Sequence, residues 1–267
     1  MSDGISAARY AERLLRAKAA VAEAEATAML VGVGPELEWL TGYAAHGGER
    51  LNLLVIPAEG PLGYISPRLE APAALAAPGF ADGRLPLHVW DETDDPFLLM
   101  PPLVSPREPL RFLVSDGLRA AFVLALQTAL PGSGWGLASD VLAPLRRVKD
   151  AEEIVLLRAA AQAADRAMER IISGPLVGRT EAEVARDVRD ALGEEGHDTA
   201  EFAIVASGPN SASPHHEPSQ RLIATGEPLL LDLGGRRAGY NSDLTRTVWI
   251  AAEDGAGPEP GFREIYE

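Results

Sequence analysis

The chain has 267 residues, 46% of them hydrophobic and 24% charged, which is ordinary for a folded globular protein. Its formal net charge of −15 disfavours nucleic acid and anionic membranes as partners, and the absence of cysteine excludes disulfides, thiolate nucleophiles and cysteine-ligated zinc. Because no signal-peptide pattern opens the chain and no apolar run reaches about 18 residues, we expect a cytoplasmic protein.

Helix and strand patterns alternate through the first half of the chain. Residues 8–24 are rich in Ala, Leu, Arg and Glu and predict a helix, and a second helix is expected over 118–130, ended by Pro131-Gly132. Short apolar runs between them predict strands at 27–33, 51–56, 63–66, 87–90 and 111–115. Such alternation indicates an α/β layer architecture.

A domain boundary is expected close to residue 148, which gives domains of 1–148 and 149–267. Just after it, Asp150 followed by Glu153 has the spacing of a helix-capping box, and Thr180 followed by Glu183 repeats that spacing. Each pair predicts the start of a helix whose apolar residues recur every three or four positions. The expected stripes are Ile154, Leu157, Ala161, Ala164, Met168 and Ile171 in the first helix, and Val184, Val188 and Leu192 in the second.

The chain then turns to β structure. Strands are expected at 202–206, 228–233 and 243–250, with a polar loop over 207–220 and a glycine-rich connection over 234–239. The last two strands would form a hairpin.

Asp232 and Asp243 are the first candidate site residues. Asp232 is the single charge inside the apolar run Leu229 to Leu233, where an ionised carboxylate is costly unless it is paired or bound to a metal. If the turn centres between Arg237 and Ala238, the two aspartates face each other directly, and their repulsion would be relieved by a pair of divalent cations. Taken alone, two aspartates at a strand end and a turn are more often simple turn residues.

The surrounding residues favour the metal interpretation. The segment Leu-Leu-Asp-Leu-Gly-Gly, followed by Gly-Tyr-Asn-Ser-Asp-Leu-Thr-Arg-Thr over 239–247, resembles the paired-aspartate signature of the pita-bread metallopeptidases. That group includes prolidase, aminopeptidase P and methionine aminopeptidase. The resemblance implies that Asp232 and Asp243 are metal ligands.

The histidine pair His215-His216 lies in a segment similar to the one that precedes the aspartates in prolidases. The resemblance gives His215 the family's catalytic role, in which it lines the substrate pocket and stabilises the tetrahedral intermediate by donating a hydrogen bond. Without the flanking match, a solvated loop histidine would be the preferred interpretation. Residue type alone does not separate His215 from His216, which we leave as its neighbour.

The first half of the chain also resembles this family. Residues 39–43 (WLTGY) are similar to a turn of the creatinase-type N-terminal domain, and residues 145–154 to the linker into the catalytic domain. The resemblance therefore covers essentially the whole chain. It implies an α/β (α+β) protein with a creatinase-like N-terminal domain over 1–148 and a truncated pita-bread domain over 149–267, closest to the prolidase and aminopeptidase P types.

The ligand set implied by the resemblance is incomplete in this sequence. The family's two aspartates are followed by a histidine and two glutamates, yet all five histidines of the chain precede Asp232. Residues 262–267 resemble the opening of a family helix that stops in its first turn. We therefore expect the chain to be a fragment of a protein that continues beyond Glu267, and to be inactive by itself.

The expected function is that of a metallopeptidase that cleaves Xaa-Pro bonds at peptide N-termini, as a dipeptidase or an aminopeptidase. By analogy it would use two divalent metal ions, Mn²⁺ or Co²⁺ first, with Zn²⁺ or Fe²⁺ as alternatives, and carboxylate ligands suit such cations. Its partners would be a proline-containing peptide and a second copy of itself in a homodimer. Two alternatives on the same fold are a metal-free, creatinase-like C–N hydrolase and a non-catalytic binding protein, and the aspartate pair argues against both.

Overall fold

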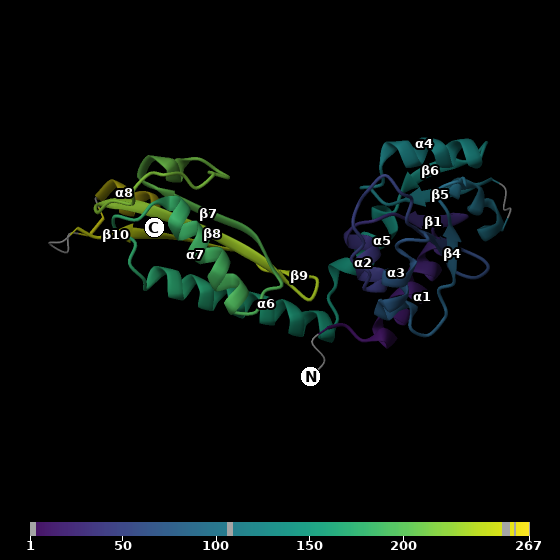
Figure 1. The fold of residues 1–267 in the computed structure, drawn as a ribbon, viewed down its shortest axis with the longest axis horizontal. Helices are drawn as coiled ribbons and strands as arrows, with labels where there is room; N and C mark the ends of the chain where they lie inside the picture. The colour runs from purple at the N-terminus through teal and green to yellow at the C-terminus, as the bar shows by residue number, and fades with distance from the viewer. Residues whose placement is uncertain (1–3, 106–108, 253–256, 259, 267) are drawn as a thin grey trace. The chain divides into compact units, whose positions relative to one another are not determined.

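The computed structural model describes residues 4–105, 109–252, 257–258 and 260–266. The chain divides into two compact units, Met1–Lys149 and Asp150–Glu267 (Figure 1). Each unit has its own sheet and its own apolar core. The mixed α/β class expected from the sequence is confirmed.

The first unit is built on a six-stranded mixed sheet in the order β4-β3-β2-β1-β5-β6. Its strands are β1 (Ala28–Val31), β2 (Leu53–Pro57), β3 (Gly63–Pro67), β4 (Leu87–Trp90), β5 (Arg111–Val114) and β6 (Gly134–Leu137). Its helices are α1 (Ala7–Glu23), α2 (Pro35–Thr41), α3 (Ala71–Ala76), α4 (Ala120–Ala129) and α5 (Ser139–Arg147). Strand β2 runs antiparallel to β1 and β3, and the other neighbours are parallel.

Helices cover both faces of this sheet. On one face, Leu14 of α1 and Leu37 of α2 pack with Met29 of the central strand, and on the other Leu126 of α4 packs with Leu30. Every residue of β1, β2 and β3 is buried. This two-sided burial explains why these strands appear in the sequence as continuous apolar runs without alternation.

The second unit has two layers. Helices α6 (Ala151–Ile172) and α7 (Glu181–Glu194) lie along one side of an antiparallel sheet in the order β10-β8-β7 (Figure 1). The remaining elements are β7 (Thr199–Ser207), the short 3₁₀ helix η4 (Gly208–Ala212), β8 (Glu227–Arg237), β9 (Tyr240–Asn241), β10 (Leu244–Ile250) and α8 (Pro260–Tyr266). Both predicted capping boxes are present, at Asp150–Glu153 and Thr180–Glu183. The predicted opening of a helix over 262–267 lies within α8 except for Glu267, which is outside the described residues.

Alternation along β8 divides its side chains between the two faces of the sheet. Leu229, Leu231 and Leu233 are buried against α6 and α7, whereas Leu230 and Asp232 are half-buried on the opposite face. Strand periodicity therefore removes Asp232 from the apolar core and places it on the face that the two helices leave uncovered. This is the face on which the candidate site lies.

The predicted apolar stripe of α6 is correct only in its second half. Ala164, Met168 and Ile171 are buried as expected, but Ile154 is 43% exposed, and Leu156 is buried instead. The first turn instead buries Glu153, whose carboxylate caps the helix and accepts a hydrogen bond from the Tyr240 hydroxyl at 3.1 Å.

Candidate metal-binding site

The turn between β9 and the end of β8 sets the register of the hairpin. Its two central residues, Ala238 and Gly239, have φ values of 47° and 85°, and Arg237 pairs with Tyr240 across them. Positive φ at both central residues is the conformation of a type I′ turn, whose twist matches that of the flanking strands. The turn therefore centres between Ala238 and Gly239, one residue later than predicted from the sequence.

The prediction that Asp232 and Asp243 face each other directly is wrong. Asp232 lies opposite Thr245, and Leu233 lies opposite Leu244. Asp243 precedes Thr245 by two residues, so the two aspartates are diagonal neighbours on the same face of the hairpin, a relation that places Cα atoms roughly 7–8 Å apart in an antiparallel pair. Two carboxylates at this spacing can still reach cations held between them.

Asp232 occupies the central strand between Ile204 of β7 and Thr245 of β10. The Thr245 hydroxyl donates a hydrogen bond to Asp232 Oδ1 at 2.7 Å. Asp243 is exposed. Among the described residues, no group of three or more His, Asp or Glu side chains lies close enough to hold a metal ion. Asp232 and Asp243 place two carboxylates on one face of the sheet, and carboxylates are the ligands that hard divalent cations prefer.

His197 supports the hairpin beside Asp243. It is buried, and its Nε2 lies 2.8 Å from the Ser242 hydroxyl while its Nδ1 lies 3.2 Å from the Leu192 carbonyl oxygen. Burial lowers the pKa of His197 below its usual value. The neutral ring therefore links the end of α7 to the residue that precedes Asp243.

The two neighbouring histidines have different surroundings. His215 is exposed and has a φ of 56°, in the left-handed region. His216 is half-buried, and its Nε2 lies 2.9 Å from Glu181 Oε2. The structure therefore distinguishes the two histidines, which the sequence alone did not. His216 contacts Glu181 of α7, whereas His215 is exposed on the same loop.

Glu181 is a polar residue that the sequence analysis missed, because only its neighbours Thr180 and Glu183 stood out as a capping pair. Its side chain is completely buried. Burial alone would raise the pKa of the Glu181 carboxyl, but hydrogen bonds from Ser219, Ser207, His216 and Asn210 outweigh it and hold the pKa well below the usual range. Its only sequence signal was the polar composition of the loop that surrounds it.

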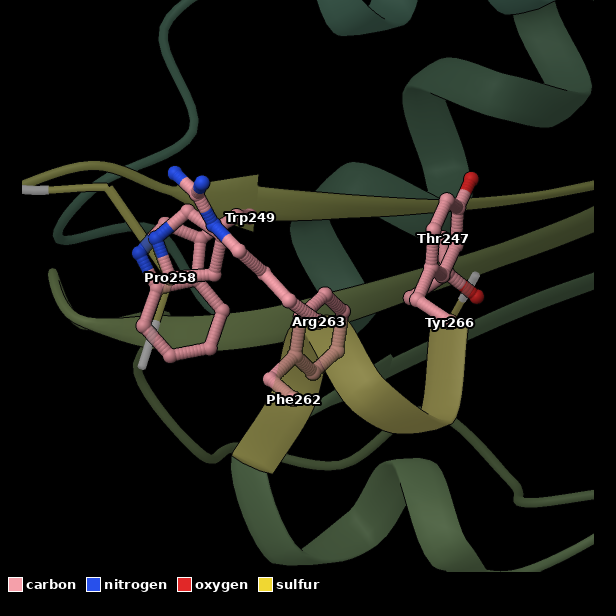
Figure 2. Close-up of a pocket in the computed structure, with 6 residues that line it drawn as sticks. All are labelled: Thr247, Trp249, Pro258, Phe262, Arg263 and Tyr266. Atoms are coloured by element: carbon pink, nitrogen blue, oxygen red, sulfur yellow. The ribbon is translucent and has the colours of Figure 1, made fainter. Parts of the chain in front are cut away.

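A pocket of about 340 Å³ lies farther along the same face of β10 (Figure 2). It is lined by Thr247 and Trp249 of β10, by Phe262, Arg263 and Tyr266 of α8, and by Pro258. The ring centroids of Trp249 and Phe262 are 5.1 Å apart. Thr247 follows Thr245 by two residues, so the pocket and the aspartates share one face of the sheet.

Comparison with known proteins identifies both units. Residues 155–267 match metallopeptidase family M24, and residues 13–148 match the creatinase/prolidase N-terminal domain. The chain is 41% identical over 246 residues to the probable dipeptidase PepE of Mycobacterium tuberculosis, covering 92% of this chain and 65% of that protein. The chain thus spans slightly less than two thirds of the length of that relative.

Solved structures give the same result. The crystal structure of dipeptidase PepE from Mycobacterium ulcerans has a TM-score of 0.90 at 37% identity, covering 98% of this chain and 69% of that one. A prolidase from Thermococcus sibiricus has a TM-score of 0.83 at 30% identity, covering 96% and 68%. In the part of the chain that the structure describes, no helix is long and apolar enough to cross a membrane.

Proposed function

The chain belongs to metallopeptidase family M24 and carries a creatinase/prolidase N-terminal domain, and on this premise we propose that it is part of a metal-dependent dipeptidase or aminopeptidase acting on Xaa-Pro bonds. The observation that carries the proposal is the placement of Asp232 and Asp243 on one face of the hairpin. The similarity to a dipeptidase and a prolidase supports the substrate class.

Asp232 and Asp243 fit a divalent metal site by the chemistry of their donors, because hard cations such as Mn²⁺ prefer carboxylate oxygens. We propose them as metal ligands, with Mn²⁺ or Co²⁺ as the first candidates. Bound cations of this class polarise a peptide carbonyl and lower the pKa of water. The Thr245 hydroxyl orients the Asp232 carboxylate, so Thr245 would fix which oxygen of Asp232 is left for coordination.

His215 is proposed to face the scissile carbonyl. An exposed imidazole can donate a hydrogen bond to the carbonyl oxygen as that oxygen gains negative charge, which stabilises the tetrahedral intermediate. The left-handed backbone at His215 supports this role, since strained conformations of non-glycine residues cluster at functional sites.

The remaining ligands are proposed to lie outside residues 1–267. No histidine follows Asp243 in the sequence, and the relatives extend beyond the matched region. We further propose that the complete protein acts as a homodimer.

Hydrolysis of a dipeptide with C-terminal proline, and of a tripeptide with proline as its second residue, tests the proposal. Residues 1–267 with excess Mn²⁺ should cleave neither peptide, whereas a protein extended to the length of the relatives should hydrolyse at least one of them and lose activity on chelation. Turnover near the enzyme median of about 10 s⁻¹ by residues 1–267 alone would refute the incomplete-site interpretation. An extended protein that binds metal but cleaves no Xaa-Pro peptide would refute the substrate assignment.

A further inference from the structure

The Glu181 carboxylate, at the first residue of α7, accepts hydrogen bonds from Ser207 at the end of β7 and from the loop that follows it. Oε1 accepts hydrogen bonds from the backbone N–H and the hydroxyl of Ser207 at 2.7 and 2.8 Å. Oε2 accepts from the backbone N–H and hydroxyl of Ser219 at 3.1 and 2.7 Å, and lies 2.9 Å from His216 Nε2. The Asn210 amide donates to both oxygens, at 3.0 and 3.2 Å.

These donors span the loop from its first residue to its last turn. Ser207 ends β7, Asn210 lies in η4, and His216 and Ser219 follow η4. An ionised carboxylate only accepts hydrogen bonds, so every one of these contacts favours the same loop conformation. A buried charge without such donors would be costly, and the loop and the carboxylate therefore stabilise each other.

A second contact closes the loop at its far end. Arg221 donates to both carboxylate oxygens of Glu227 at 2.7 and 2.6 Å, and also to the Ser207 hydroxyl at 2.6 Å. Arg221 does not contact His215 or His216 through any of these bonds. Hydrogen bonds from Arg221 therefore hold the two ends of the loop, and hydrogen bonds to Glu181 hold residues along its length.

His215 lies inside the segment that Glu181 fixes. Its φ of 56° is unfavourable for a residue with a side chain, and the residue immediately after it is held by Glu181 through the His216 ring. A left-handed conformation of this kind persists only where the surrounding structure over-determines it. Glu181 supplies that constraint.

We propose that Glu181 is a positioning residue for His215: its carboxylate fixes the loop over 207–219 and thereby the place of the His215 imidazole. The inference rests on the proposed function for the catalytic meaning of His215. Its structural content is separate, because the loop conformation requires neither metal nor substrate.

The test is histidine NMR on the chain of residues 1–267, comparing Glu181→Gln with Glu183→Gln. Gln keeps the shape of Glu181 but presents an N–H₂ donor to Ser207 or to Ser219 and His216, whose groups also donate. Glu183 is a matched control because it lies on the same turn of α7 and is exposed, and among the described residues its hydrogen bonds are those of the cap at Thr180. His197 is an internal reference, since it is buried in the same unit and bonds elsewhere.

In Glu181→Gln, the imidazole signals of His215 and His216 should move toward those of an unstructured histidine while the His197 signal stays in place. Exchange of the Ser207 and Ser219 amide protons should accelerate by about tenfold or more, because each loses a charge-assisted hydrogen bond. Glu183→Gln should change none of these signals. An unchanged His215 signal in Glu181→Gln, or the same change in Glu183→Gln, would overturn the proposal.

If Glu181→Gln shifts the His197 signal as well, the unit has lost its fold, and Ser219→Ala is the deciding variant. It removes the hydroxyl that donates to Oε2 and that accepts a hydrogen bond from the Arg221 backbone N–H, and it retains the buried charge. A smaller displacement of the His215 signal in the same direction supports the proposal, and an unchanged signal contradicts it. Neither result depends on peptidase activity, so a failure of the proposed function would remain separately visible.

Discussion

At the scale of single residues, Glu181 links the charge state of one buried carboxyl to the stability of the second unit. Its folded-state pKa is held below the usual value of 4.5, so the ionised form stabilises the fold above pH 4.5 and this contribution is lost as the pH falls below it. The free energy of unfolding of Glu181→Gln should lie about 3 kcal/mol or more below that of the natural chain at pH 7.

That difference in unfolding free energy should shrink as the pH is lowered from 7 to 3.5. Over this range the Glu181 carboxyl becomes protonated in the unfolded chain before it does in the folded one, which favours the unfolded state of the natural chain. Urea unfolding at both pH values measures it. Glu183→Gln should show a much smaller difference at pH 7, because Glu183 is exposed. A Glu181→Gln difference that stays constant over this pH range would contradict the burial and bonding described for the carboxyl.

Ala238 is a second residue with a measurable consequence. Its φ of 47° costs an alanine about 1–2 kcal/mol relative to ordinary helical or strand conformations. Ala238→Asn should raise the free energy of unfolding by about 0.5–1 kcal/mol, because Asn-Gly is a preferred pair for a type I′ turn. Gly239→Ala is the opposite change, because it places an alanine at a positive φ, and it should lower the free energy of unfolding by a similar amount. Chemical denaturation decides, and a destabilised Ala238→Asn variant would disprove the turn assignment.

At the scale of elements, the hairpin shows what the sequence could and could not predict. Both strands were expected from their apolar patterns, but the register was wrong because no pattern revealed that Ala238 would adopt a left-handed conformation. The resulting shift moves the partner of Asp232 from Asp243 to Thr245, two residues on. A shift of two preserves the face of every side chain, so the aspartates still share one face.

The error in α6 has a related cause. Apolar spacing predicted a stripe through Ile154, but the first turn buries Glu153, which caps the helix and also accepts a hydrogen bond from Tyr240. That contact joins residues far apart in the sequence. Long-range polar contacts of this kind, like those of Glu181, leave no periodic signal.

The hairpin register itself predicts a role for Thr245 in the complete protein. Thr245→Val keeps the shape of the side chain but removes the hydrogen bond to Asp232, so metal affinity or activity should fall by about 10- to 100-fold. Thr247→Val is the matched control, two residues along the same face and without a bond to Asp232. Metal titration of both variants measures the effect, and equal losses in the two would contradict the orienting role.

At the scale of the whole molecule, the two units have separate apolar cores, and the faces of their sheets are buried to different extents. The sheet of the first unit is packed on both faces, whereas Phe202, Ile204 and Leu230 of the second remain half-buried on the face opposite α6 and α7. Less apolar area is removed from water there, so the second unit should be the less stable one. We expect residues 1–267 to unfold in two steps.

Tryptophan fluorescence can assign these steps. Trp39, Trp90 and Trp135 belong to the first unit and Trp249 to the second. The low-denaturant step should disappear from the fluorescence of Trp249→Phe, while circular dichroism still records it. A single transition reported identically by both probes would show that the units unfold together.

We have proposed that Asp232 and Asp243 hold the metals of an M24 peptidase, and metal content measured together with activity tests this assignment. In the protein extended to the length of its relatives, Asp232→Asn and Asp243→Asn should each reduce bound metal and kcat/KM together. The double variant should lose little more, because residues that act as a unit are not additive.

Asp198→Asn, an equal change of charge at a carboxylate that bonds to the hairpin turn instead, should keep both metal and activity. His215→Ala should lower kcat with the metal retained. An Asp232→Asn protein with full metal content and full activity would show that Asp232 is not a metal ligand.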